Sequence, residues 1–111
     1  DNLNNDEKKR FRQIIDDCLV TEFYSLNDII SKKIGEHGNK LSAGQKQRVN
    51  LARALFKKSD VIFLDEPTSN LDENTEKVLL ENIFKQYNDK LLIVSTHRKE
   101  VLNYSNLTIN L

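Results

Sequence analysis

Apolar residues recur along this chain at two spacings, and the spacing indicates the kind of element in each stretch. In residues 6–20 they fall at i, i+3 and i+4 intervals, which predicts an amphipathic helix with Cys18 on its apolar face. The same spacing predicts helices over residues 43–57 and 73–87. Four consecutive apolar residues at 61–64, between polar neighbours, are typical of a buried parallel strand instead.

Four further stretches complete the predicted order of elements. Residues 91–94 indicate a second buried strand and residues 107–111 a third, whereas residues 26–30 are a short apolar cluster that predicts a turn of helix. Residues 34–41 hold two of the three glycines and are predicted to form a loop. Strands that alternate with helices in the latter part indicate an α/β fold with a parallel sheet, preceded by about forty mostly helical residues.

Composition places the chain among soluble globular proteins. It has 111 residues, enough for one small domain, of which 38% are apolar and 31% charged. No apolar run approaches the roughly 18 residues that a membrane-spanning helix needs, so a membrane role would come through a partner or another part of a longer polypeptide. No signal peptide is visible in the first residues.

Charge and cysteine usage narrow the classes of function. Basic and acidic residues number 17 each, and this balance gives no support to nucleic-acid binding. The single cysteine, Cys18, excludes an internal disulfide and fits a reducing compartment. Because free cysteines are commonly buried, we expect Cys18 to be a core residue.

Two adjacent carboxylates follow the first predicted strand. That strand would carry Asp65 and Glu66 to the carboxyl edge of the sheet, where ligands of parallel sheets bind. In phosphate-transferring enzymes an acid at this place holds Mg²⁺, and a second acid can orient the attacking water or accept its proton. The alternative interpretation is a strand that ends in a solvated Asp-Glu turn.

A helix start with an unusual sequence precedes these carboxylates. Ser42 followed by Gln45 matches a capping box, which is the purely structural interpretation. The same free N–H groups, helix dipole and serine hydroxyl are also a ready anion site, which a phosphate could approach closely at Gly44. A third candidate is His97, just past the second strand, whose neutral imidazole could bind a phosphate oxygen or the attacking water. Taken alone, such a histidine is more often a surface residue.

These motifs together resemble the ATP-binding-cassette family. Residues 41–45 look like its signature motif, residues 61–66 its Walker B strand with the catalytic glutamate, residues 68–72 its D-loop and His97 its switch histidine. The resemblance implies a partial P-loop NTPase, or RecA-like, parallel sheet. Residues 1–45 would belong to the helical signature subdomain and residues 46–111 to the ATPase core.

The resemblance also implies a role for each matching residue. Asp65 would hold Mg²⁺, Glu66 would act on the water that attacks ATP, and His97 would sense the γ-phosphate. Asp72 would lie at the interface of a head-to-tail dimer of two such domains.

The signature residues Ser42, Gly44 and Gln45 would contact ATP held mainly by the second nucleotide-binding domain. One departure from the family pattern is Ala43, where glycine is usual. If this position required a positive φ, alanine would cost about 1 kcal/mol.

Two features are similar to exporters in particular. Residues 34–38 resemble the loop by which exporter-type domains touch their transmembrane partner, although a plain glycine-containing loop is the alternative. The run 44–48 and the helix 10–18 are similar to multidrug-resistance-associated, or C-subfamily, exporters. The implied location is the cytoplasmic face of a membrane. The alternative function is a soluble cassette ATPase of DNA repair, chromosome maintenance or translation.

The phosphate-binding loop of the family is missing from this sequence. No Gly-x-x-x-x-Gly-Lys-Ser/Thr motif occurs in the chain, so we expect the isolated chain to bind ATP poorly and to hydrolyse none. The resemblance implies that the strand leading into that loop lies between the strand at 91–94 and the predicted strand at 107–111.

Overall fold

The computed structural model of the chain describes residues 3–25 and 41–111. The predicted cluster at 26–30 and residues 34–40 of the predicted glycine-containing loop, with its exporter-like part, lie outside the described residues. Within them the elements follow the predicted alternation of helices with strands, and the mixed α/β fold is confirmed. None of the described helices has the length and apolar character needed to span a membrane.

Helix α1 (Asn5–Asp17) begins at a complete capping box. The Asn4 side chain accepts a hydrogen bond from the Glu7 N–H at 2.8 Å, and the Asn4 N–H donates to the Glu7 carboxylate at 3.1 Å. The prediction extended this helix to residue 20, but it ends earlier because Leu19 adopts a left-handed conformation with φ 60°. A short 3-10 helix, η1 (Val20–Glu22), follows.

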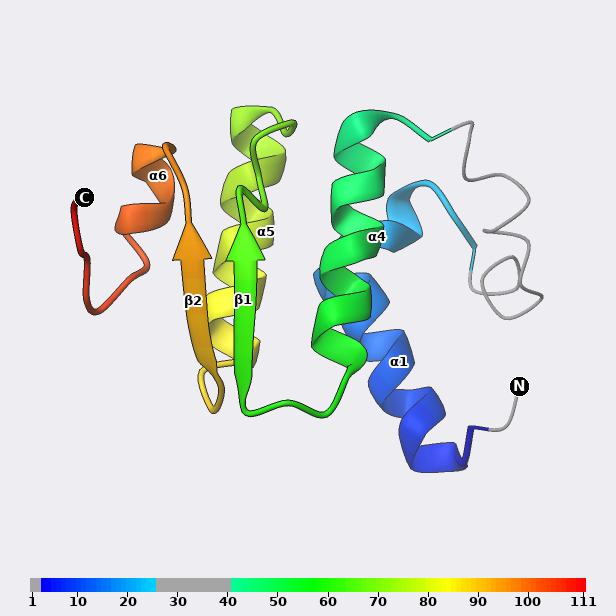
Figure 1. Cartoon of the computed structure of the whole chain (residues 1–111). Helices are drawn as coiled ribbons and strands as arrows, with labels where there is room; N and C mark the ends of the chain where they lie inside the picture. The colour runs from blue at the N-terminus through cyan, green and yellow to red at the C-terminus, as the bar shows by residue number, and fades with distance from the viewer. Residues whose placement is uncertain (1–2, 26–40) are drawn as a thin grey trace.

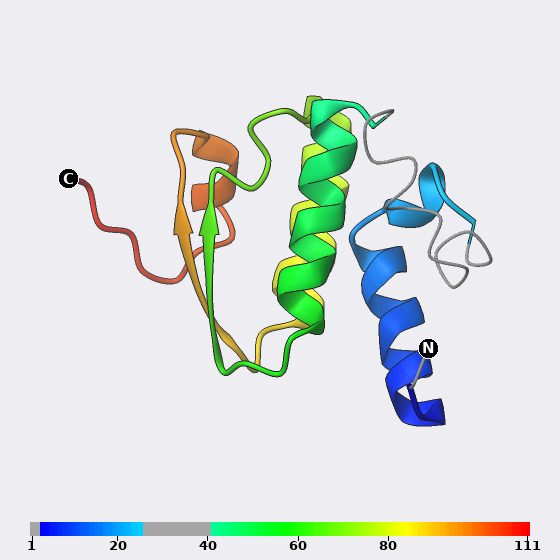
Figure 2. The same cartoon turned by 45° about the vertical axis from the view of Figure 1, so that its right-hand side comes forward.

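Helix α4 (Ala43–Phe56) lies against α1, as Figures 1 and 2 show. The Phe11 and Phe56 rings meet edge to face at 5.5 Å, and the Arg10 guanidinium donates to the Leu55 carbonyl at 3.0 Å. An arginine–carbonyl hydrogen bond at this helix end satisfies an acceptor that lacks a partner within the helix.

The sheet has two parallel strands, β1 (Val61–Asp65) and β2 (Leu91–Ser95), joined through α5 (Glu73–Gln86). Their register pairs Asp65 with Ser95, so both strands end at the same edge. In Figure 1 both strands point upward, and α4 and α5 both begin at the top of the molecule.

Both strands were predicted to be buried, and the structure contradicts this for one face of the sheet. Ile62 is buried against the helices, but Phe63 is 74% exposed, and Val61, Leu91 and Ile93 are exposed with it. Successive side chains of a strand point to opposite faces, and among the described residues only one face is covered, by α4 and α5.

The predicted third strand at 107–111 is not formed. Leu107 and Ile109 are 78% and 75% exposed, and the segment runs away from the sheet as an irregular chain end (Figure 2). A strand exists only where its N–H and C=O groups pair with a neighbour, and no described segment lies beside residues 107–111 to supply that pairing. A one-turn helix, α6 (Lys99–Leu102), was not predicted.

The core lies where α1, α4, α5 and β1 meet. Cys18 is fully buried there, as predicted, and burial raises the pKa of its thiol. At the edge of this core the Tyr87 hydroxyl donates to the buried Asp17 carboxylate at 2.8 Å. This bond joins the C-cap residue of α5 to the last residue of α1.

Candidate functional site

The two carboxylates lie where β1 ends. Asp65 is the last residue of β1 and is exposed. Glu66 has φ 49°, the left-handed region that side chains other than glycine rarely occupy. Its N–H donates to the Ser95 carbonyl at 2.7 Å, which holds this unusual backbone to the end of β2. Such conformations persist only where the surroundings fix them, and they are frequent at functional sites.

His97 lies beside Glu66. The imidazole Nε2 is 3.6 Å from Glu66 Oε1, and the histidine side chain is 98% exposed. The structure therefore brings together one carboxylate from the end of β1 and the imidazole that follows β2. The exposed imidazole and the partly exposed carboxylate of Glu66 are both accessible to a ligand.

The signature residues form the predicted capping box at the start of α4. The Gln45 N–H donates to Ser42 Oγ at 3.1 Å, and the Ser42 N–H donates to Gln45 Oε1 at 3.0 Å. Ser42 is exposed and Gln45 is partly exposed, and α4 begins at the top of the molecule in Figure 1. The helix start thus presents a serine hydroxyl and a helix dipole to the outside, on the edge that carries Glu66.

Gly44 is buried rather than open to a ligand. A Cβ at this position would lie 2.8 Å from the Asn70 carbonyl oxygen and 3.1 Å from a Leu71 methyl carbon. Because an alanine would collide with this backbone, glycine is needed for α4 to approach residues 70 and 71. Ala43 opens the helix without a positive φ, so alanine in place of the family's glycine has no backbone cost here.

Asp72 caps α5. Its carboxylate accepts hydrogen bonds from the Thr75 hydroxyl at 2.6 Å and from the Thr75 N–H at 3.1 Å. These bonds lower the pKa of Asp72, the hydroxyl bond most strongly. Asp72 is nonetheless exposed, at the end of the segment that we call the β1–α5 loop (residues 66–72).

Sequence reasoning missed two groups that hold this loop. The Gln47 amide contacts it from α4, with bonds to the Glu66 carbonyl, Ser69 Oγ and the Asn70 N–H. From the other side Arg98 pairs with Glu76 and also donates to the Leu71 carbonyl at 3.2 Å. Neither role has a local signal, because each pairs residues at least 19 positions apart.

The residues at this edge fit a magnesium ion that is shared with phosphates. No group of three or more potential ligands among His, Cys, Asp and Glu occurs in the described part of the chain. Mg²⁺ usually takes only one or two carboxylates and completes its shell with water and substrate phosphates. The exposed Asp65, with Glu66 next to it, suits that arrangement.

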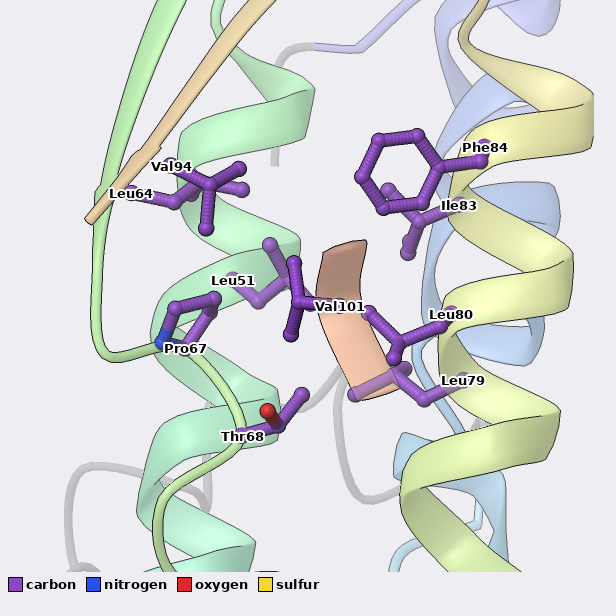
Figure 3. Close-up of a pocket in the computed structure, with 10 residues that line it drawn as sticks. All are labelled: Leu51, Leu64, Pro67, Thr68, Leu79, Leu80, Ile83, Phe84, Val94 and Val101. Carbon is purple, nitrogen blue, oxygen red and sulfur yellow. The ribbon is translucent and has the colours of Figure 1, made fainter. Parts of the chain in front are cut away.

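An apolar pocket lies between the sheet, α4, α5 and α6 (Figure 3). Leu64 and Val94 line it from the strands and Leu80 and Phe84 from α5, and its surface is apolar. Asp65, Glu66 and His97 are not among its lining residues. The pocket is part of the helix–sheet packing and contributes no charged group to the site.

Comparison with known proteins matches the chain to one family. The model of the ABC transporter family matches residues 3–69. The chain is 45% identical over 87 residues to a putative export ATP-binding/permease protein of Rickettsia felis, covering 78% of this chain and 15% of that protein.

Two eukaryotic proteins are also similar to this chain. Bile pigment transporter 1 of Saccharomyces cerevisiae is 39% identical over 74 residues, covering 67% of this chain and 5% of that protein. ABC transporter C family member 7 of Dictyostelium discoideum is 38% identical over 96 residues, covering 84% of this chain and 7% of that protein. The chain thus spans a small part of these relatives, and the match to the family model covers α4 and β1. The chain belongs to the ABC transporter family.

Proposed function

We propose that this chain is the later part of a nucleotide-binding domain whose ATP hydrolysis drives export of a substrate across a membrane. The observation that supports it best is the pairing of Glu66 with His97 where the two strands end, with α4 beginning on the side of the molecule toward which the strands point (Figure 1). Residues 1–45 would belong to the helical subdomain and residues 46–111 to the ATPase core. This boundary falls inside the first turns of α4.

In the proposed reaction a water molecule attacks the γ-phosphorus of ATP, and the bond from that phosphorus to the β–γ bridging oxygen breaks. The Glu66 carboxylate accepts the proton of the water, and ADP leaves with the bridging oxygen. His97, 3.6 Å from Glu66, would donate a hydrogen bond to the γ-phosphate. Mg²⁺, held with the help of Asp65, would neutralise charge on the phosphates.

Ser42, Gly44 and Gln45 would serve the ATP of a second nucleotide-binding domain. The exposed Ser42 and the dipole of α4 support this assignment, since both favour an anion brought from outside the chain. The buried Gly44 would act by letting α4 approach the β1–α5 loop. Asp72, exposed at the end of that loop, would lie in the interface between the two domains.

Relatives named as exporters and transporters support an exporter over a soluble cassette ATPase. The relative named as a C family member supports the predicted resemblance to that subfamily. We infer that the domain lies at the cytoplasmic face of a membrane and works with transmembrane domains. Equal numbers of acidic and basic residues again favour these partners over nucleic acid.

The isolated 111-residue chain is expected to give no saturable heat when titrated calorimetrically with magnesium-ATP, and to release no phosphate from it. The main hold on the β- and γ-phosphates in this family comes from a loop motif that the sequence lacks. The intact polypeptide that carries these residues, titrated alongside, is expected to bind ATP. Micromolar binding by the isolated chain would show that we have misplaced the nucleotide site.

The intact polypeptide is expected to fractionate with membranes and to remain there after washing with high salt and alkaline carbonate. A soluble cassette ATPase would appear in the supernatant, and a protein bound only by charge would be released by the salt. A polypeptide found only in the soluble fraction would contradict the exporter proposal and leave the proposed ATPase chemistry standing.

A further inference from the structure

The side-chain amide of Gln47 makes three hydrogen bonds to the β1–α5 loop. Its Nε2 donates to the Glu66 carbonyl oxygen at 2.9 Å and to Ser69 Oγ at 2.8 Å. Its Oε1 accepts from the Asn70 N–H at 3.0 Å. One side chain of α4 therefore holds both the first residue of the loop and its middle.

The chemistry of the partners fixes the orientation of this amide. A backbone carbonyl can only accept and a backbone N–H can only donate, so Nε2 must face Glu66 and Oε1 must face Asn70. No other common side chain of this length offers a donor and an acceptor together. Glutamate would keep only the acceptor, and leucine would keep the volume with neither.

Glu66 needs such a hold because its backbone lies in the left-handed region. The Ser95 carbonyl binds its N–H at 2.7 Å, and Gln47 binds its C=O, so both backbone polar groups of Glu66 have partners from different elements. Together these bonds set the direction in which the Glu66 side chain leaves the end of β1, toward His97.

We propose that Gln47 is a positioning residue for hydrolysis: it holds the backbone of Glu66 so that the carboxylate meets the attacking water. This inference rests on the proposed function, in which Glu66 accepts the proton of that water. Gln47 lies in the same helix as Ser42 and Gln45, the proposed contacts to the partner's ATP. A shift of α4 would therefore move the backbone of Glu66 directly through the Gln47 amide.

The test compares three variants of the intact polypeptide, measured below their melting temperatures: Gln47→Leu, Gln47→Glu and the matched control Gln86→Leu at the exposed end of α5. We expect Gln47→Leu to lower kcat for ATP hydrolysis roughly 10- to 100-fold, because a small misplacement of a catalytic group has effects of this order. The KM for ATP is expected to stay within about 2-fold, since no ground-state contact to ATP is removed. Gln47→Glu is expected to resemble Gln47→Leu, and Gln86→Leu to resemble the wild type.

If Gln47 affects hydrolysis only by positioning Glu66, changing Gln47 should have little effect on the rate once the Glu66 carboxylate has been removed. Gln47→Leu in a Glu66→Gln background is therefore expected to leave the residual rate unchanged in a single-turnover assay. The proposal is overturned if Gln47→Leu keeps the kcat of Gln86→Leu. It is also overturned if Gln47→Leu lowers the Glu66→Gln rate by the same factor as it lowers the wild-type rate. If the Glu66→Gln variant hydrolyses ATP at the wild-type rate, the proposed role of Glu66 in the proposed function is itself contradicted.

Hydrogen exchange gives a second measurement that does not depend on the residual rate. Amides of the β1–α5 loop are expected to exchange faster in Gln47→Leu than in Gln86→Leu, while amides of α5 stay alike in the two. Equal exchange of the loop in both variants would overturn the proposal, whatever the kinetic result.

Discussion

A Glu66→Gln variant of the intact polypeptide is expected to hydrolyse ATP about 100- to 10,000-fold more slowly than the wild type, with nearly unchanged affinity for ATP. Glutamine has the shape of glutamate but cannot accept the proton of the attacking water. The change leaves the Glu66 backbone, with its bonds to Ser95 and Gln47, as it is. The loss therefore belongs to the carboxylate and not to the fold of the loop.

The measurement is kcat and ATP affinity on one preparation, with Glu81→Gln, an exposed glutamate of α5, as the matched control. The expected pattern is a fall in kcat alone for Glu66→Gln and no change for Glu81→Gln. A loss of ATP affinity with an unchanged kcat would mean that Glu66 only binds the nucleotide in the ground state. Wild-type turnover would exclude Glu66 as the group that accepts the proton.

The fold was predictable where local spacing decides the structure. The capping box at Ser42 and the burial of Cys18 next to α1 each depend on residues a few positions apart. The third strand at 107–111 was not predictable in this way, because a strand needs a partner in space and its apolar residues show only that it would accept one.

The site shows the same division. The order of motifs suggested that Glu66 and His97 share one edge, and parallel strands in register bring them to 3.6 Å. The left-handed Glu66, the Gln47 amide and the need for glycine at 44 could not be deduced, because each arises where α4 meets the β1–α5 loop. Contacts between residues far apart in the chain produce no periodic or local pattern from which they could be predicted.

Replacing Arg98 with leucine is expected to lower the free energy of unfolding of the chain by about 3 kcal/mol at pH 7. Arg98 donates two hydrogen bonds of 2.9 Å to Glu76, whose side chain is only 3% exposed. Removing the arginine leaves a buried carboxylate without its cation. Because Arg98 itself is about one third exposed, the expected loss lies at the low end of what buried ion pairs show.

The loss of stability in Arg98→Leu is expected to depend on pH, and the shift in the pKa of Glu76 determines the direction of that dependence. Burial alone would raise that pKa, but the hydrogen bonds and charge of Arg98 bring it below its ordinary value. In the wild type the pair therefore stabilises the chain above about pH 4, the ordinary pKa of glutamate, and this contribution is lost as pH falls through the lowered pKa. Without Arg98 the pKa of Glu76 rises. Acidification then protonates the buried Glu76 carboxylate and removes the unpaired charge that destabilises the Arg98→Leu variant. The difference in free energy of unfolding between the wild type and Arg98→Leu is therefore expected to become smaller as the pH is lowered.

Urea unfolding at pH 7 and at pH 4 checks both statements, with the exposed Arg12→Leu as the matched control. The double variant Glu76→Leu with Arg98→Leu is expected to recover most of the loss, since two apolar side chains of similar volume leave no charge buried. A double variant as unstable as Arg98→Leu alone would show that the bond from Arg98 to the Leu71 carbonyl carries the effect. The β1–α5 loop would then depend on Arg98 directly, and the loss would not change with pH.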